Sequence, residues 1–366
     1  MRRSLKPSIR FLPNRLSFSI SNLFRLACLL GALSAEPVLL AQQPAEGKAA
    51  LEKKEGDLSA PTRSPLAPPA AQRGPGNSDE FRLSIETDLV VLHAVVTDRA
   101  SRPITDLKQD YFKVFEDNVE QKLKIFKRED IPVSVGMVVD NSGSMRDKRK
   151  GVNTAALKFV RSSNPKDEVF IVNFNDESFL DTDFTDSVSL LEEALEKIDA
   201  RGGTAFYDAL DLALKHLTEK ATWDKKVLLL ITDGEDNASR ISLEQIVKNV
   251  QRANVMIYTV GLLSGESSRS LRRAKRALEA ISKASGGSTF FPKNLEEVQV
   301  IANDIANDIR NQYVLAYTPT NAVLDGKFRK VEVRVNAPRL GRLAVRTRTG
   351  YYAKSATPEN PQRSGL

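Results

Sequence analysis

The sequence predicts an α/β fold with a doubly wound, mostly parallel sheet and a small accessory β domain. Between residues 131 and 312, short apolar runs alternate with stretches whose apolar residues recur every three or four positions. This alternation indicates buried strands that take turns with amphipathic helices. Strands connected by helices form a parallel sheet with helices on both faces. Residues 79–130 and 313–353, on either side, have strand-like patterns only.

The elements of the α/β region follow from these patterns in order along the chain. Four apolar runs predict buried strands, at Val133–Val139, Val169–Phe174, Val227–Ile231 and Val255–Val260. Helical spacing predicts four helices, at Lys148–Val160, Leu190–Ile198, Ala205–Leu217 and Leu243–Ala253, and a last one near Leu295–Ile309.

The two flanking segments are expected to be β-rich. In the prefix, strand-like runs occupy Leu89–Thr97, Phe112–Phe115 and Gln121–Phe126, and in the tail Tyr313–Tyr317, Phe328–Val335 and Leu343–Tyr352. A segment of about fifty residues buries little core by itself. We therefore expect prefix and tail to pair into one small domain, with the α/β domain inserted between them. The alternative is a prefix that docks separately on the α/β domain.

Residues 1–41 are typical of a signal peptide for export. A basic stretch precedes an apolar run at Leu26–Leu33, and small residues follow at Ser34, Ala35 and Ala41. Cleavage after Ser34 or after Ala41 fits, and the run is too short for a good membrane span. The expected location is extracytoplasmic, periplasmic or secreted. An uncleaved anchor is the alternative.

The remaining terminal segments are expected to be disordered. Residues 42–78 are rich in proline and alanine and indicate a flexible linker, and residues 354–366 a disordered end. The net charge of +7 includes +5 from residues 1–41, and the difference leaves only +2 for the rest. The charge therefore gives no indication of nucleic-acid binding. The single cysteine, Cys28, lies in the leader, so a cleaved chain has neither disulfides nor cysteine-bound metals.

Polar side chains follow two of the predicted strands. Asp140-Asn141-Ser142-Gly143-Ser144 comes after the first strand, and Asp233-Gly234 after the strand at Val227–Ile231. A third loop, Arg201-Gly202-Gly203-Thr204, precedes a helix. Ligands of open parallel sheets bind at the carboxyl ends of the strands, so these loops are expected to meet. Two carboxylates and three hydroxyls form an oxygen set that suits Mg²⁺ or Mn²⁺.

These three segments resemble, in order, the metal-ion-dependent adhesion site of von Willebrand factor A domains, and the chain from about Phe81 looks like a bacterial exported group of related proteins. The resemblance implies a VWA domain over residues 131–312, with the cation held by Asp140, Ser142, Ser144, Thr204 and Asp233. Ser142 and Ser144 would bind it directly, and the other three directly or through water. One position would stay open for an acidic group of a protein ligand. Asn141, Tyr207 and Asp208 lie near the expected site and are candidate ligand-binding residues.

The resulting hypothesis is an exported adhesion or protein-interaction module without enzymatic activity. The alternatives are a hydrolytic enzyme that uses the same metal site and a structural scaffold of the cell envelope. A serine nucleophile would need a base, yet His93 falls in a predicted strand and His216 in a predicted helix, away from the loops. A calcium loop from Asp233 to Glu244 is disfavoured because Ala238 stands where glycine is required.

Overall fold

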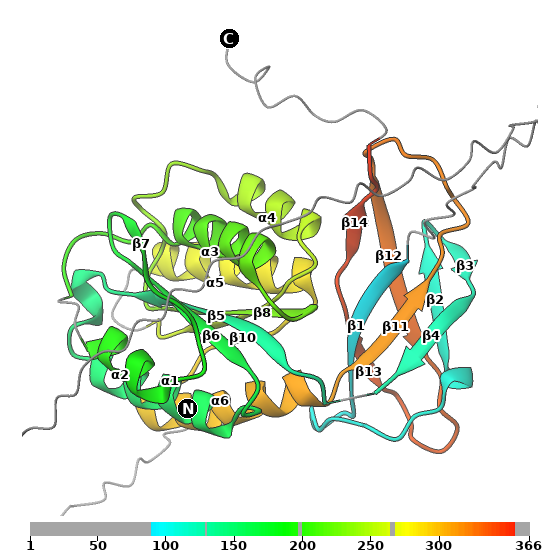
Figure 1. Ribbon diagram of the computed structural model, residues 1–366, viewed down its shortest axis with the longest axis horizontal. Coiled ribbons are helices and arrows are strands. Elements are labelled where there is room, and N and C mark those ends of the chain that lie inside the picture. Colours follow the sequence, from blue (N-terminus) through cyan, green and yellow to red (C-terminus); the bar gives the residue numbers. More distant parts are fainter. Residues whose placement is uncertain (1–88, 129, 197–199, 264–267, 356–366) are drawn as a thin grey trace, which may run out of the picture. The chain divides into compact units, whose positions relative to one another are not determined.

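A six-stranded sheet forms the centre of the α/β domain in the computed structural model, which describes residues 89–128, 130–196, 200–263 and 268–355 (Figure 1). The expected signal peptide, the linker and most of the C-terminal end lie outside these residues. The strand order is β10-β9-β8-β5-β6-β7. All neighbours pair in parallel except β7, which pairs antiparallel with β6. The strands are β5 (Val133–Asp140), β6 (Glu168–Phe174), β7 (Ser178–Thr185), β8 (Lys225–Thr232), β9 (Met256–Gly261) and β10 (Thr289–Phe290).

Helices cover both faces of this sheet, which confirms the predicted doubly wound arrangement. The first face packs on α1 (Arg149–Ser162), α2 (Val188–Glu196) and α6 (Leu295–Arg310). The second packs on α3 (Phe206–Lys220), α4 (Leu243–Arg252) and α5 (Ser268–Ser285). Every residue of β5 is buried because the strand lies in the middle of the sheet. Successive side chains of a strand point to opposite faces, so Val139 enters one core and Val138 the other.

The strands of the prefix pair with those of the tail. One sheet has the order β13-β1-β11-β4 and the other β14-β12-β2-β3. β1 (Val90–Thr97) pairs antiparallel with β11 (Tyr313–Tyr317), and β2 (Phe112–Glu116) with β12 (Phe328–Val335). The remaining strands are β3 (Val119–Gln121), β4 (Leu123–Lys127), β13 (Ala344–Arg346) and β14 (Gly350–Tyr352). The α/β domain therefore follows β4 and precedes β11 along the chain.

Hydrogen bonds tie the prefix and the tail together inside this accessory β region. The hydroxyls of Tyr317 and Tyr351 each donate to Oε2 of Glu116 at 2.8 Å. The hydroxyl of Tyr313 accepts from the backbone of Leu107 at 3.0 Å and donates to the carbonyl of Ile104 at 2.9 Å. The shared core contains residues from both segments, so neither segment buries its apolar face alone.

The expectation of one continuous strand over Leu343–Tyr352 is wrong. β13 pairs with β1, whereas β14 pairs with β12 in the other sheet. The chain therefore passes from one sheet to the other between Arg346 and Gly350, and the two strands cannot form one continuous ladder. A Cβ at Gly350 would lie 2.3 Å from the carbonyl oxygen of Arg329, so the close approach at this crossing requires glycine.

Contacts join the β region to the α/β domain near the amino ends of the central strands. Arg346 forms an ion pair with Asp308 of α6 at 2.5 Å. The backbone of Thr349 donates to the carbonyl of Ala284 at 3.3 Å, and the guanidinium of Arg252 lies 5.2 Å from the ring centre of Tyr352. No helix in the described part of the chain is both long and apolar enough to cross a membrane.

Candidate functional site

Asp140 is the last residue of β5 and is fully buried at the carboxyl end of the strand. Its Oδ1 accepts the backbone N–H of Ser142 at 2.7 Å, and its Oδ2 accepts the hydroxyl of Thr232 at 2.6 Å. Burial raises the pKa of Asp140 to about 6, against the lowering effect of the hydrogen bonds from Thr232 and Ser142. These two donors fix the orientation of the carboxylate beneath the loop that follows.

Three oxygen-bearing side chains converge above Asp140. The hydroxyls of Ser142 and Ser144 lie 3.1 Å apart, and the Ser144 hydroxyl donates to Oδ1 of Asp233 at 2.7 Å. Asp233 is buried directly after β8, which is the neighbour of β5 in the sheet. The parallel pairing of β5 with β8 therefore brings together side chains that are about ninety positions apart in the sequence.

Thr204 belongs to a loop that hydrogen-bonds to both neighbouring loops. The backbone of Gly143 donates to the carbonyl of Gly202 at 3.2 Å, and the backbone N–H and carbonyl of Thr204 both bond to Asn237. Thr204 is 4 % exposed. Gly202 has a φ of +77°, and a Cβ there would lie 2.1 Å from the Asp176 carboxylate, so the path of the loop requires glycine.

A lysine completes the charge arrangement at the site. Nζ of Lys148 donates to Oδ2 of Asp233 at 2.6 Å and to the carbonyl of Leu262 at 3.3 Å. Lys148 lies immediately before α1, one helical turn after Ser144. Both oxygens of Asp233 thus have donors, one a hydroxyl and the other an ammonium group.

The three candidate ligand-binding residues have mainly supporting contacts. Asn141 is 1 % exposed, and its amide bonds to Asn173 at 2.7 Å and accepts from Arg149. The carboxylate of Asp208 accepts the backbone N–H groups of Arg240 and Ile241. Burial raises the pKa of Tyr207 to about 12, and its backbone bonds to Asp236. These contacts position the loops, and they leave less of each side chain for a ligand.

The spacing of the oxygens fits an octahedral hard cation. Mg²⁺ binds oxygen at 2.0–2.1 Å, which separates adjacent ligand oxygens by about 2.9 Å. The two distances among Ser142, Ser144 and Asp233, 3.1 and 2.7 Å, bracket that value. Within the described residues no group of three His, Cys, Asp or Glu side chains could hold a metal. A cation here would therefore depend on hydroxyl oxygens, which suits Mg²⁺ or Mn²⁺ better than a metal that prefers nitrogen or sulfur.

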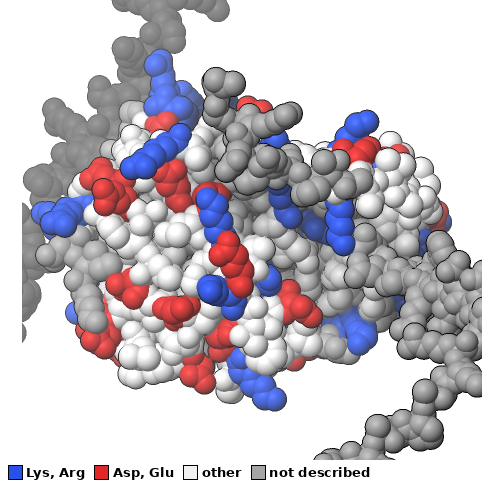
Figure 2. Space-filling view, turned by 45° about the horizontal axis from the view of Figure 1, so that its top comes forward, with Lys and Arg blue, Asp and Glu red and all other residues white. Residues whose placement is uncertain are grey.

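Neither histidine is placed to activate the two serines. His216 of α3 packs on Phe170 and Phe184, with Nε2 2.8 Å from Asp183, and His93 belongs to β1 in the accessory region. The hydroxyls of Ser142 and Ser144 instead contact each other and Asp233. Figure 2 shows acidic and basic side chains interspersed on the face that it presents.

The sequence did not reveal the partners that fix the site. Thr232 precedes Asp233, Lys148 directly precedes a helix, and Asn237 lies in a loop, positions where each could equally face solvent. Only for Thr232 does the sequence contain an indication of its role. A hydroxyl at the end of a fully buried strand needs a hydrogen-bond partner.

Comparison with known proteins matches residues 135–304 to the family model of the von Willebrand factor type A domain. No match was found among curated proteins. Similar solved structures include an aerotolerance-related membrane protein from Bacteroides fragilis, with 20% identity and a TM-score of 0.40 over 48% of this chain and 98% of that one. Another is the vWF domain of the type V pili tip protein Mfa5 from Porphyromonas gingivalis, with 14% identity and a TM-score of 0.42 over 49% and 95% of the two chains.

A third similar structure is proximal thread matrix protein 1 from the mussel byssus, described with zinc in its MIDAS motif. It has 18% identity and a TM-score of 0.44 over 53% of this chain and 50% of that one.

Proposed function

Residues 135–304 of the chain form a von Willebrand factor type A domain, and from that premise we propose that the protein is an exported interaction module. It binds a macromolecular ligand, most simply a protein, through a divalent cation held by Asp140, Ser142, Ser144, Thr204 and Asp233. The observation that supports this most strongly is the convergence of the Ser142, Ser144 and Asp233 oxygens within hydrogen-bond distance of one another at the carboxyl ends of β5 and β8.

The residues divide into two roles in this proposal. Ser142, Ser144 and Asp233 face one another and would contact the cation. Asp140 already accepts two hydrogen bonds, so it would act largely by its negative charge and by orienting Ser142. Thr204 would supply its hydroxyl, directly or through a water molecule.

An acidic ligand group follows from the charge balance. A bound Mg²⁺ or Mn²⁺ would supply an electrophilic centre for a further oxyanion, because only two of the five residues that would hold it are carboxylates. The ammonium of Lys148 beside Asp233 reduces the local negative charge further. A carboxylate from the partner would therefore be bound in preference to a neutral amide.

The proposed place of action is outside the cytoplasm. The support comes from the leader in the sequence, with its basic stretch, apolar run and small residues. A domain without cysteine is also compatible with export, because its folding does not depend on the redox conditions of the compartment.

The test is capture of partners from an extract of the cell envelope by the immobilised chain, in Mg²⁺ and in EDTA. The matched variants are Asp233→Ala and Glu235→Gln, because Glu235 is two residues away and pairs with Arg273 instead. We expect that EDTA and Asp233→Ala abolish capture and that Glu235→Gln retains it. Short peptides of aspartate or glutamate should compete for capture better than their amide counterparts. Capture that is unchanged in EDTA and in Asp233→Ala would refute the proposal.

A further inference from the structure

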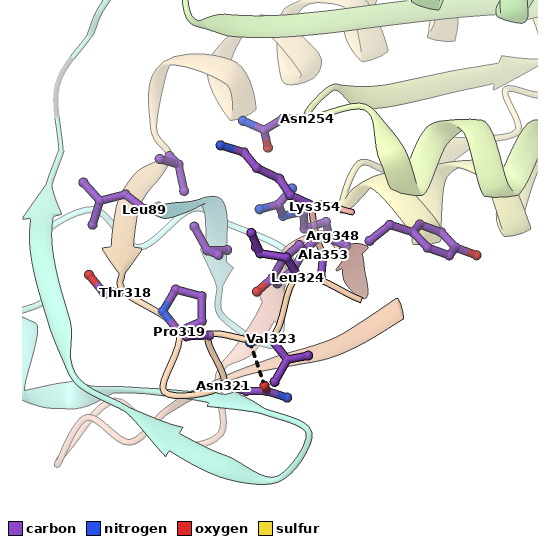
Figure 3. A pocket seen from close by; sticks show the side chains of 15 residues that line it. Leu89, Asn254, Thr318, Pro319, Asn321, Val323, Leu324, Arg348, Ala353 and Lys354 are labelled. Atoms are coloured by element: carbon purple, nitrogen blue, oxygen red, sulfur yellow. Dashed lines mark hydrogen bonds between the residues drawn. The ribbon is translucent and has the colours of Figure 1, made fainter. Parts of the chain in front are cut away.

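A cavity of about 590 Å³ lies where the accessory β region meets the α/β domain (Figure 3). Its lining comes from the start of β1, from the connection between β11 and β12, from the chain around β14, and from Asn254. Asn254 precedes β9, so this cavity lies toward the amino ends of the parallel strands. The proposed metal site lies at their carboxyl ends, and the two sites are therefore distinct.

The walls of the cavity are largely apolar. Leu89, Val323 and Leu324 line it and remain 42, 60 and 47 % exposed, respectively, although they are large aliphatic residues. Tyr352 and Pro319 add further apolar surface. A volume of this size is within the usual range for small-molecule sites, which are mostly apolar with a few well-placed polar groups.

The cavity also has polar groups in its lining. Arg348 and Lys354 line it, and none of the described lining residues is an aspartate or glutamate. The Nε of Arg348 and the hydroxyl of Thr318 are both buried without a hydrogen-bond partner. An unpaired buried donor is costly, and native structures leave few of them.

The contacts of Arg348 within the described part of the chain include no ion pair. Its guanidinium lies 5.3 Å from the ring centre of Tyr351, which is a cation–π contact and not an ion pair. The hydroxyl of Tyr351 donates to Glu116, and so does that of Tyr317, so the negative charge of Glu116 is already satisfied by phenols. Burial lowers the pKa of Arg348, as expected for a charge without a counter-ion.

A second, smaller cavity shares lining residues with the first and repeats the pattern. Arg348 and Asn254 line both cavities, and His93 lines the second. Nδ1 of His93 is also buried without a partner. Donor-bearing groups from β1, from the end of β11 and from the crossing between β13 and β14 therefore gather around one place.

We propose that this junction cavity binds a small organic carboxylate with an apolar body. The carboxylate accepts hydrogen bonds from the Arg348 guanidinium. The apolar body packs against Leu89, Val323 and Leu324. An inorganic anion would leave the apolar walls uncovered, and a neutral apolar molecule would leave the arginine without a counter-ion. The ligand would touch both parts of the molecule and so strengthen their contact.

The test is isothermal titration of the full chain with three probes: 4-phenylbutyrate, its neutral amide 4-phenylbutyramide, and acetate. We expect saturable binding of one equivalent of phenylbutyrate. The amide should bind roughly tenfold to a hundredfold more weakly because it loses a charge-assisted hydrogen bond, and acetate should bind more weakly by a similar factor because it has no apolar body to bury. Equal binding of carboxylate and amide, or no binding of phenylbutyrate, would overturn the proposal. Acetate binding as tight as that of phenylbutyrate would overturn it as well.

Variants separate the cavity from the rest of the surface. Arg348→Met keeps an unbranched side chain but removes the charge, and it should weaken phenylbutyrate binding to the level of the amide. Arg342→Met changes an exposed arginine outside the cavity lining and should have no effect. Ala322→Trp, at an exposed position of the wall, should block the cavity and decides the matter if Arg348→Met fails to fold. Full affinity in a folded Arg348→Met or in Ala322→Trp would contradict the assignment.

Discussion

Nζ of Lys148 lies 2.6 Å from Oδ2 of Asp233, so a protein cation touches the carboxylate that is proposed to hold a metal. The Asp233 carboxylate is fully buried, whereas the Lys148 side chain is 22 % exposed. The lysine thus has access to water, and the carboxylate has none. This relation suggests that Lys148 and a divalent cation share the negative charge of the same group.

Replacing Lys148 by methionine should strengthen metal binding. The substitution removes a positive charge that opposes a second cation a few ångströms away, and at an effective dielectric constant near 20 such repulsion is worth a few kcal/mol before screening. We expect roughly tenfold tighter Mn²⁺ binding after allowance for solvent. The measurement is a Mn²⁺ titration followed by electron paramagnetic resonance, with Lys150→Met as the control because Lys150 is exposed on the same helix. Weaker binding in Lys148→Met would show instead that the lysine organises the site.

His93 should make the folded state sensitive to acid. Burial, with the nearby charges of Lys225 and Arg348, lowers its pKa to about 4. Its folded pKa is thus below the unfolded value of about 6.5, so its contribution to stability is complete above pH 6.5 and is lost as the pH falls toward 4. The maximal effect is on the order of 3 kcal/mol. In urea unfolding at pH 7 and pH 4.5, His93→Gln should lose less stability than the wild type over this interval. His216→Gln is the matched control, and a loss in His93→Gln equal to that of the wild type would contradict the assignment.

Removing residues 313–366 should unfold the prefix. β1 would lose its partners β11 and β13, β2 would lose β12, and β4 would lose β11. The pairings that remain within the prefix are at most three residues long and cannot replace those ladders. Residues 90–127 should therefore lose protease resistance and amide protection. A chain that ends at residue 355 serves as the control and should keep both. If residues 90–127 remain protected in the shorter chain, the prefix docks independently on the α/β domain.

The sequence predicted the buried elements well because their patterns are local. The strand at Val133–Val139 corresponds to β5, and the helix at Leu243–Ala253 corresponds to α4. β7 was missed, since only three of its eight residues, Phe179, Leu180 and Phe184, are apolar and most of the strand is partly or fully exposed at the edge of the sheet. A strand at the edge of a sheet is little buried, so its sequence lacks the apolar pattern from which buried strands are predicted.

The site was predictable as a set of residues but not as an arrangement. Asp140, Ser142 and Ser144 are close in sequence, and a tight loop is enough to bring them together. The approach of Asp233 depends on the order of the strands, with β8 beside β5, which local patterns do not reveal. The contacts of Thr232 with Asp140 and of Lys148 with Asp233 depend on the same order. They appear only when the sheet is assembled.

The central claim is tested most directly by titrating the metal itself. Mn²⁺ is added to the full chain and the free ion is followed by electron paramagnetic resonance, in the wild type, in Ser144→Ala and in Glu235→Gln. Ser144 bridges Ser142 and Asp233, so its hydroxyl should be essential, whereas Glu235 is held by Arg273 outside the site. We predict one bound Mn²⁺ per chain that excess Mg²⁺ displaces, weakened at least about tenfold by Ser144→Ala and unchanged by Glu235→Gln. An unchanged stoichiometry and affinity in Ser144→Ala, or no bound Mn²⁺ in the wild type, would contradict the account.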